Sequence, residues 1–152
     1  MDTVKVIEKM NDCLRHEWTG VAQYAQAGFV VPGLWREVYG EKFFGNAKES
    51  FKHAQLVGDK IVSLGGVPTV ERNPVKQSND LMELLQNGLE FESKAVKLYT
   101  ELLELTGEDR ALSVFLENIL LEEQEGVDEF TKILRGQACH AAQGTAPAAK
   151  VG

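Results

Sequence analysis

The stretch Gly65 to Asp80, with the sequence GGVPTVERNPVKQSND, determines how the rest of this chain can be arranged. Its two leading glycines are residues that commonly end a helix, and Pro68 and Pro74 disfavour a helix across its middle. Its last three residues, Ser78 to Asp80, are favourable N-caps for a following helix. The stretch therefore predicts a loop of about 15 residues, which is long enough to run the length of a helical bundle.

On both sides of this loop, apolar residues recur at spacings of three and four, which is the pattern of amphipathic helices. Four helices of about 25 to 30 residues each are predicted; they cover about residues 4–31, 34–64, 80–105 and 110–134. The short connections at 32–33 and 106–109 imply two antiparallel hairpins, whereas the long loop would make the second and third helices parallel. The predicted fold is all-α, a four-helix bundle with one long crossover between the second and third helices. An all-antiparallel bundle is the alternative.

The same pattern indicates one domain, residues 1–136, followed by a tail, residues 137–152. Gly136 is expected to end the fourth helix, because glycine commonly follows the last helical residue. The tail is rich in Ala and Gly and is predicted to be poorly ordered. Cys139 and His140, which lie in this tail, are expected to be bystanders rather than metal ligands.

The charge balance excludes two classes of partner. Lys and Arg number 16 against 23 Asp and Glu, which gives a formal net charge of -7. Because binding to phosphates needs a basic surface, we expect neither nucleic acid nor an anionic membrane as a partner. No apolar stretch is long enough for a membrane span, no secretion signal is visible, and Cys13 and Cys139 lack partners at metal-ligand spacing. We therefore expect free thiols and a cytoplasmic location.

Polar residues interrupt the apolar stripes near the middle of all four predicted helices: Glu17, His53, Glu92 and Glu123. A single glutamate on a helix is usually solvated, and a single histidine on an apolar face is usually a satisfied core residue. A buried carboxylate, however, must pair with a cation, take up a proton or bind a metal. One such residue on each helix therefore favours a shared metal site, and carboxylates with imidazole suit iron or manganese.

Short motifs on the four predicted helices are informative together: Glu17 to Tyr24 (EWTGVAQY), Phe51 to Ala54 (FKHA), Leu89 to Glu92 (LEFE) followed by Tyr99, and Glu122 to Asp128 (EEQEGVD). With these motifs, residues 4–134 resemble the bacterioferritins and their ferritin-like relatives. The resemblance implies the bundle with a crossover, assembly of many copies into a hollow shell, and a di-iron site in each bundle that oxidises Fe(II). It also implies that four of the six usual ligand positions are occupied here by Glu17, His53, Glu92 and Glu123.

The chain departs from the family at the other two positions, where Ser50 replaces a glutamate and Gly126 replaces a histidine. Glu49 is not expected to substitute for the missing glutamate, because helical geometry turns it away from the stripe toward solvent. We therefore expect about one iron ion per chain rather than two. Haem is not expected, because Phe51 stands where bacterioferritins have the haem-binding methionine, and the methionines of this chain lie elsewhere, at Met1, Met10 and Met82.

The resulting hypothesis is an iron-binding ferritin-like protein involved in iron oxidation, storage or detoxification, with an incomplete di-iron centre. A catalytically inactive structural or mixed-shell subunit is one alternative, and a ferritin-like oxidase using manganese or peroxide is another. Whether a weak ferroxidase activity survives is left open by the sequence. Apolar residues around the first hairpin predict a homo-oligomer; they are Phe29, Trp35, Tyr39, Phe43 and Phe44. A DNA-protecting mini-ferritin is disfavoured, because no basic arm precedes the first helix.

Overall fold

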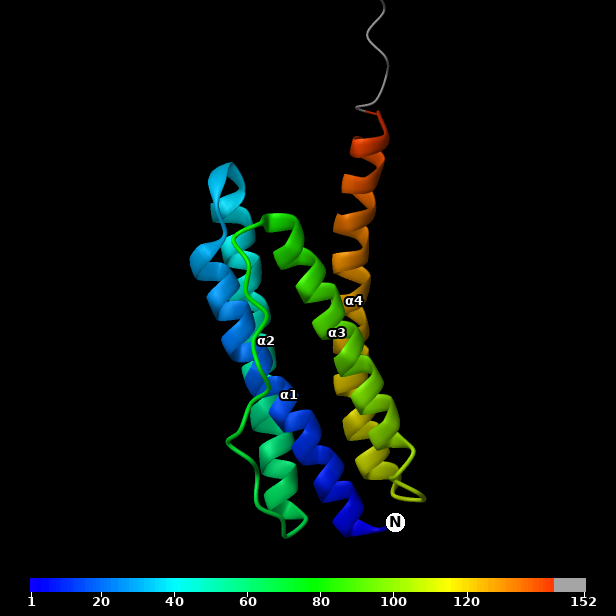
Figure 1. Ribbon diagram of the computed structural model, residues 1–152. Coiled ribbons are helices and arrows are strands. Elements are labelled where there is room, and N and C mark those ends of the chain that lie inside the picture. The colour runs from blue at the N-terminus through cyan, green and yellow to red at the C-terminus, as the bar shows by residue number, and fades with distance from the viewer. Residues whose placement is uncertain (144–152) are drawn as a thin grey trace, which may run out of the picture.

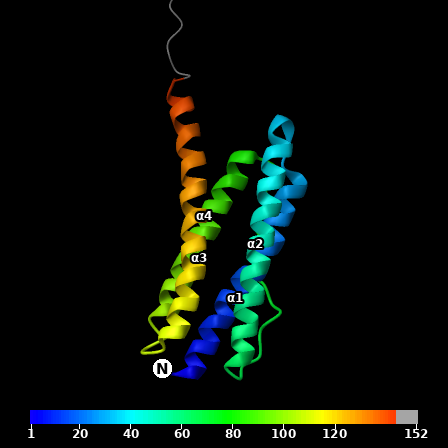
Figure 2. The same cartoon turned by 180° about the vertical axis from the view of Figure 1, so that it is seen from behind.

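The computed structural model describes residues 1–143 and consists of four long helices. They are α1 (Thr3–Val30), α2 (Arg36–Ser63), α3 (Leu81–Leu103) and α4 (Arg110–Gln143), with a short 3-10 helix, η1 (Gly33–Trp35), between the first two. Figures 1 and 2 show two antiparallel hairpins, α1 with α2 and α3 with α4, and a crossover that runs back along the first hairpin. Because α2 and α3 are parallel, the predicted bundle with one long crossover is confirmed and the all-antiparallel alternative is excluded.

Several helix ends follow from local signals in the sequence. The Asp80 carboxylate accepts a hydrogen bond from the Glu83 amide at 2.9 Å and caps α3. Asp109 accepts one from the Leu112 amide at 2.9 Å and starts α4 in the same way. α2 ends just before Gly65, whose φ of 85° is strained for any residue that carries a Cβ. The two glycines that follow α2 therefore fix where the crossover begins.

The end of α4 differs from the prediction, because this helix continues through Gly136 to Gln143. A single glycine costs only about 1 kcal/mol in a helix, and the residues that follow it are mostly Ala and Gln, which are good helix formers. The predicted helix end at Gly136 is therefore wrong, and the last turns of α4 extend beyond the start of α3 (Figure 1). The predicted disorder of residues 144–152 and the bystander roles of the Cys139 and His140 side chains lie outside the part of the chain that the structure describes.

Side chains of α1 hold the crossover in place. The Trp18 indole N–H donates to the Thr69 carbonyl at 3.0 Å, and the Asn73 amide donates to the Thr19 hydroxyl at 2.8 Å. Because a loop has few backbone partners of its own, these side chains satisfy donors and acceptors that would otherwise be left unpaired against the helix. The crossover therefore lies along α1, and its residues Asn73 to Lys76 lie near the first half of α3.

The bundle interior has two apolar clusters with a polar layer between them. The first cluster, at the end of the bundle that holds the N-terminus, includes Met10, Ile61 and Leu116. The second, at the opposite end, includes Tyr24 and Phe130. Along α1, α3 and α4, the buried polar positions fall between the residues that belong to these two clusters, and on α2 Ser50 and His53 do so, whereas Asn46 lies within the second cluster. The apolar stripes of the sequence are therefore interrupted at one common level of the bundle.

Two expectations from composition can be compared with this fold. Cys13 is a free thiol and is completely buried. Burial raises the pKa of this thiol, so that the reactive thiolate form is suppressed. Among the described residues, none of the helices has a segment long and apolar enough to cross a lipid bilayer.

Candidate metal centre

Each helix contributes one predicted ligand to the polar layer, and all four of these side chains are buried. Glu17 is 0% exposed, His53 1%, Glu92 6% and Glu123 4%. Their inward orientation agrees with the register of the apolar stripes. Together with His16, which is 3% exposed, these residues place five ionisable groups in an interior of low polarity, where each one needs a partner.

Three of the four, Glu17, His53 and Glu123, form a compact group, which we call the inner group. The His53 Nδ1 lies 2.8 Å from Glu123 Oε1 and 3.8 Å from Glu17 Oε1. One ligand atom from each residue lies within 4.8 Å of the other two. The Tyr99 hydroxyl donates to Glu17 Oε1 at 2.7 Å, whereas Glu17 Oε2 is buried without a hydrogen-bond partner among residues 1–143. A cation held by this group would provide the partner that Oε2 lacks.

Glu92 lies beside the inner group rather than in it. Its carboxylate accepts a hydrogen bond from the Tyr24 hydroxyl, and within the described part of the chain it joins no set of three ligand atoms. Gly126 explains this position, because a Cβ added there would lie 2.7 Å from Glu92 Oε2. The carboxylate of Glu92 therefore fills space that a side chain at position 126 would need.

A second set of ligand atoms, the outer group, surrounds the other ring nitrogen of His53. The His53 Nε2 lies 3.0 Å from Glu122 Oε2, and atoms of Glu49, His53 and Glu122 lie within 4.8 Å of one another. Glu122 also accepts a hydrogen bond from Lys52 Nζ at 2.8 Å. Because Glu49 and Glu122 are only half-buried, this group reaches the surface of the bundle.

The outer group shows that the predicted orientation of Glu49 is wrong, and it adds Glu122 to the candidate site residues. Glu49 does not point freely into solvent, as predicted, but is half-buried beside His53. The prediction used the geometry of one helix, and it could not include the neighbouring helix α4, which brings Glu122 next to Glu49. Glu122 was missed as a site residue, although it directly precedes Glu123 in the motif on which the family resemblance rests.

Burial and mutual charge set the protonation of these residues. Burial, followed by the charge of Glu123, raises the pKa of Glu17 and raises that of Glu92 to about 9. Burial alone would lower the pKa of His53 and raise that of Glu123. The hydrogen bond and the opposite charges of these two residues outweigh burial, so the pKa of His53 rises and that of Glu123 falls. Without a bound metal, the charged forms of His53 and Glu123 are therefore favoured, whereas the neutral forms of Glu17 and Glu92 are favoured.

The comparison with known families agrees with this geometry. The Ferritin family model, described as a ferritin-like domain, matches residues 7–137. The chain belongs to the ferritin-like family. The resemblance seen in the sequence motifs is therefore confirmed for the family, and membership supports an iron-related function in general for this ferritin-like chain.

Two solved structures are similar to this ferritin-like chain. A ferritin-like, diiron-carboxylate protein from Bacillus anthracis str. Ames is 28% identical, with a TM-score of 0.85, over 88% of this chain and 98% of that one. A dodecameric thioferritin, the bacterioferritin-related protein from Bacteroides fragilis, is 26% identical, with a TM-score of 0.87, over 96% of this chain and 94% of that one. A comparison with curated proteins gives no match.

Proposed function

We propose that this ferritin-like protein binds Fe(II) as its substrate at Glu17, His53 and Glu123 and oxidises it. These residues form an incomplete di-iron centre that holds about one ion per chain. The observation that carries the proposal is the inner group itself. Its three ligand atoms lie within 4.8 Å of one another, and it includes a carboxylate oxygen, Glu17 Oε2, that is buried without a partner in the described residues. Two carboxylates and an imidazole are a ligand set that suits iron. Storage or detoxification would follow if copies of the chain assemble around the ferric product.

Each residue of the inner group has its own role in this proposal. The carboxylates of Glu17 and Glu123 offset the charge of the ion, and they stabilise Fe(III) more than Fe(II) because Fe(III) carries the larger charge. His53 is suited to bind through Nδ1, since its Nε2–H can donate to Glu122 and thereby fix the tautomer. Tyr99 orients Glu17 through its hydroxyl. The electron that Fe(II) loses passes to a small oxidant such as dioxygen or peroxide.

The residues present do not fit a symmetrical pair of ions. Ser50 offers a hydroxyl in place of a carboxylate, and Gly126 offers no ligand atom. Glu92, the fourth predicted ligand, accepts a hydrogen bond from Tyr24 and occupies the space beside Gly126. These three features together support an incomplete centre, in which a second ion would have too few ligands to bind tightly.

A structural subunit is a second candidate function, and one observation favours it. The contact of 2.8 Å between His53 and Glu123 and the hydrogen bond between Tyr24 and Glu92 satisfy most of the polar layer without any metal. The buried carboxyl groups of Glu17 and Glu92 argue against this candidate, because burial raises the pKa of both and a purely structural core gains nothing from burying them.

Metal titration of the protein after treatment with a chelator tests the proposal. In the absence of air, we expect Fe(II) to bind at about one ion per chain, and the ferric form to appear in the ultraviolet spectrum once air is admitted. Mn(II), titrated in a separate sample, tests the alternative of a manganese-using oxidase. If neither metal binds, the proposal fails and the structural subunit takes its place.

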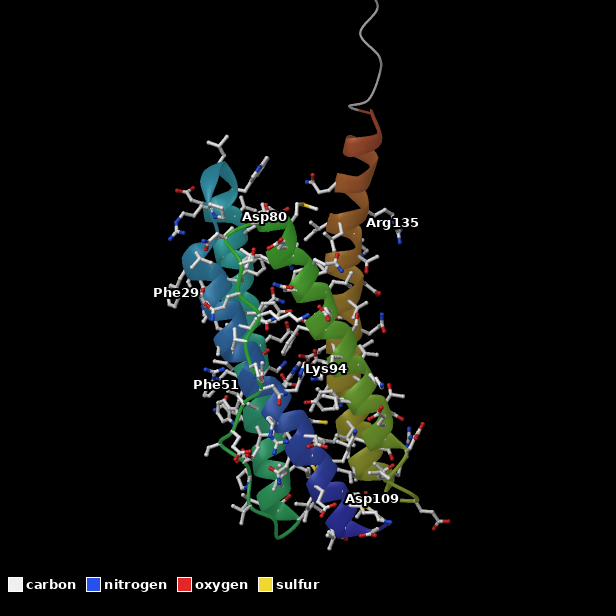
Figure 3. All side chains as sticks on the ribbon, viewed as in Figure 1. Phe29, Phe51, Asp80, Lys94, Asp109 and Arg135 are labelled. Carbon is white, nitrogen blue, oxygen red and sulfur yellow. The ribbon has the colours of Figure 1, made fainter. Side chains whose placement is uncertain are left out.

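We also propose that the chain forms a homo-oligomer. One of its relatives is dodecameric, and large apolar side chains are exposed around the first hairpin. Phe29 is 66% exposed and Trp35 61%, and Figure 3 shows Phe29 at the outer edge of the bundle. Of the other residues predicted for this surface, Tyr39 and Phe44 are half-buried. Phe43 was wrongly placed on the surface, because it is completely buried in the second apolar cluster.

Light scattering is expected to give a mass well above that of the 16.8 kDa subunit. Replacing Phe29 and Trp35 together by Glu should lower this mass, because assembly would then bury two unpaired charges. Val4→Glu is the matched control, since Val4 is also 66% exposed and lies at the opposite end of α1. A wild-type monomer at micromolar concentration would contradict the proposed assembly.

A further inference from the structure

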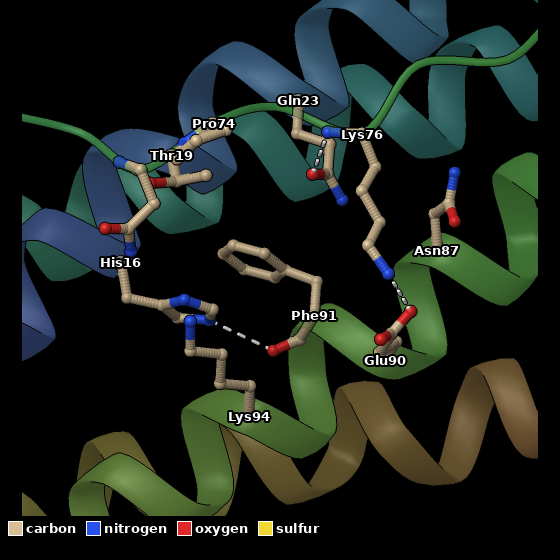
Figure 4. A pocket seen from close by; sticks show the side chains of 10 residues that line it. His16, Thr19, Gln23, Pro74, Lys76, Asn87, Glu90, Phe91 and Lys94 are labelled. Atoms are coloured by element: carbon tan, nitrogen blue, oxygen red, sulfur yellow. Dashed lines mark hydrogen bonds and ion pairs between the residues drawn. The ribbon is translucent and has the colours of Figure 1, made fainter.

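A cavity of about 160 Å³ lies on the surface between α1, the crossover and α3 (Figure 4). Its lining is mostly polar and comes from all three elements; it includes His16, Gln23, Lys76, Phe91 and Lys94. The amide of Lys76 donates to Gln23 Oε1 at 3.0 Å, which ties the crossover to α1 at this wall. We call this cavity the Phe91 port.

Phe91 is the largest apolar side chain of the port and is held in a defined position. Its ring stacks on the His16 ring with centroids 3.9 Å apart and an interplanar angle of 11°. The Phe91 carbonyl lies 3.0 Å from His16 Nε2, and burial lowers the pKa of His16 to about 4. His16 is therefore neutral near pH 7, and its Nε2–H donates to the carbonyl. Figure 4 shows the Phe91 ring between His16 and Gln23.

The inner end of the Phe91 ring reaches the polar layer. A Cβ added to Gly20 would lie less than 3.0 Å from both the Phe91 Cζ and the Ser50 Oγ, so these two side chains meet beside Gly20. Ser50 is buried and lies one helical turn before His53 on α2. The ring of Phe91 also packs edge-on against Tyr24, with centroids 5.2 Å apart. Phe91 therefore spans the wall between the port and the residues that surround the inner group.

The port and the outer group differ in charge. The charged side chains that line the port are Lys76, Glu90 and Lys94; Lys76 is paired with Glu90, and Lys94 forms no ion pair among the described residues, so the port does not attract cations. The outer group, in contrast, presents the carboxylates of Glu49 and Glu122 at the surface. A cation is therefore attracted to the outer group, and an uncharged molecule has no electrostatic reason to avoid the port.

We propose that the Phe91 port is the route by which a small uncharged oxidant, of the class of dioxygen or hydrogen peroxide, reaches the centre, with the ring of Phe91 as its gate. This inference rests on the proposed function for the identity of the molecule, but the gate itself is a property of the metal-free bundle. The cavity is several times larger than the roughly 30 Å³ share of one water molecule, so it can hold such an oxidant. Rotation of the Phe91 ring away from Gly20 would open the way to Ser50.

The gate can be tested without any metal through the reactivity of a cysteine placed behind it. Ser50→Cys is introduced together with Cys13→Ala and Cys139→Ala, so that one thiol remains. Methyl methanethiosulfonate, which is small and uncharged, is the probe: the thiolate attacks its sulfenyl sulfur, a mixed disulfide forms and methanesulfinate leaves. Adding Phe91→Ala should raise the modification rate at least about tenfold, and Phe91→Leu should give an intermediate rate.

Phe51→Ala is the matched control, because Phe51 adjoins Ser50 in the chain but is 44% exposed and lies outside the port. It should change the rate less than about twofold. An equal rate with and without Phe91→Leu in folded protein, or an equal increase with Phe51→Ala, would overturn the gate. The Fe(II) titration is independent of this result. Loss of metal binding with a functioning gate would remove the proposed function, and with it the oxidant as the molecule that passes, but would leave the gate. Intact binding with no gate would remove this inference alone.

Discussion

Glu123→Gln is expected to weaken Fe(II) binding at least about 100-fold, which corresponds to about 2.8 kcal/mol. Glu123 Oε1 lies 2.8 Å from His53 Nδ1 and belongs to the only set of three fully buried ligand atoms found in residues 1–143. The amide keeps the size of the side chain but removes the negative charge that would offset the ion. Anaerobic calorimetry, or the visible absorption of Co(II) as a substitute ion, would measure the loss.

Glu125→Gln makes the same chemical change one half-turn along α4, at an exposed position, and should leave binding unchanged. Glu92→Gln should weaken the binding of the first ion less than Glu123→Gln does, because Glu92 is directed toward Tyr24 and lies outside the inner group. Circular dichroism must show that Glu123→Gln is folded, since removing one partner of a buried ion pair commonly costs about 3 to 5 kcal/mol. Wild-type affinity in folded Glu123→Gln would show that the inner group is not the metal site.

The fold could be predicted from the sequence because its deciding features are local. Glycine, proline and N-cap residues predict the crossover from Gly65 to Asp80. Its length predicts that α3 runs parallel to α2. The end of α4 could not be predicted in the same way. At Gly136 a helix-stop residue competes with the helix propensity of the Ala-rich residues that follow, and the difference is only about 1 kcal/mol.

The site was predicted less completely, because side-chain direction depends on neighbouring helices. Sequence periodicity found one buried ionisable residue of the polar layer on each helix, but it did not single out His16. It could not show that Glu122 approaches Glu49, since these residues meet only when α2 and α4 pack together. Nor could it show that Glu92 would turn toward Gly126, since that depends on the space left by a missing side chain.

Combining Ser50→Glu with Gly126→His is expected to raise metal binding from about one ion per chain to about two, and to speed Fe(II) oxidation at least about tenfold. The introduced Glu would lie three residues before His53, and the introduced His three residues after Glu123. Residues at this spacing project from the same face of a helix about one turn apart. The two substitutions would therefore supply the two ligands that the resemblance to the bacterioferritins implies for these positions.

The structure also indicates how Glu92 would respond. A Cβ at position 126 would stand 2.7 Å from Glu92 Oε2, which is too close, so the carboxylate must move. It is the far end of a flexible side chain that already lies next to Glu123, and leaving Tyr24 would free it to turn further toward the inner group. Replacing glycine by histidine should add roughly 0.3 to 0.5 kcal/mol of helix stability, against an overpacking cost of about 1 to 3 kcal/mol in the core. Thermal unfolding would show which contribution is larger.

Ser50→Gln with Gly126→Ala is the matched control, because it matches the size of the introduced Glu and displaces Glu92 with the same Cβ, without adding an anionic or imidazole ligand. It should bind no second ion and should oxidise Fe(II) no faster than the wild type. Stopped-flow absorbance of the ferric product, measured for all three proteins at equal iron, separates the outcomes. If the double variant folds, binds two ions and oxidises iron no faster, then missing ligands are not what limits this centre. The limit would then lie in the delivery of the oxidant, which places the next substitution at Phe91.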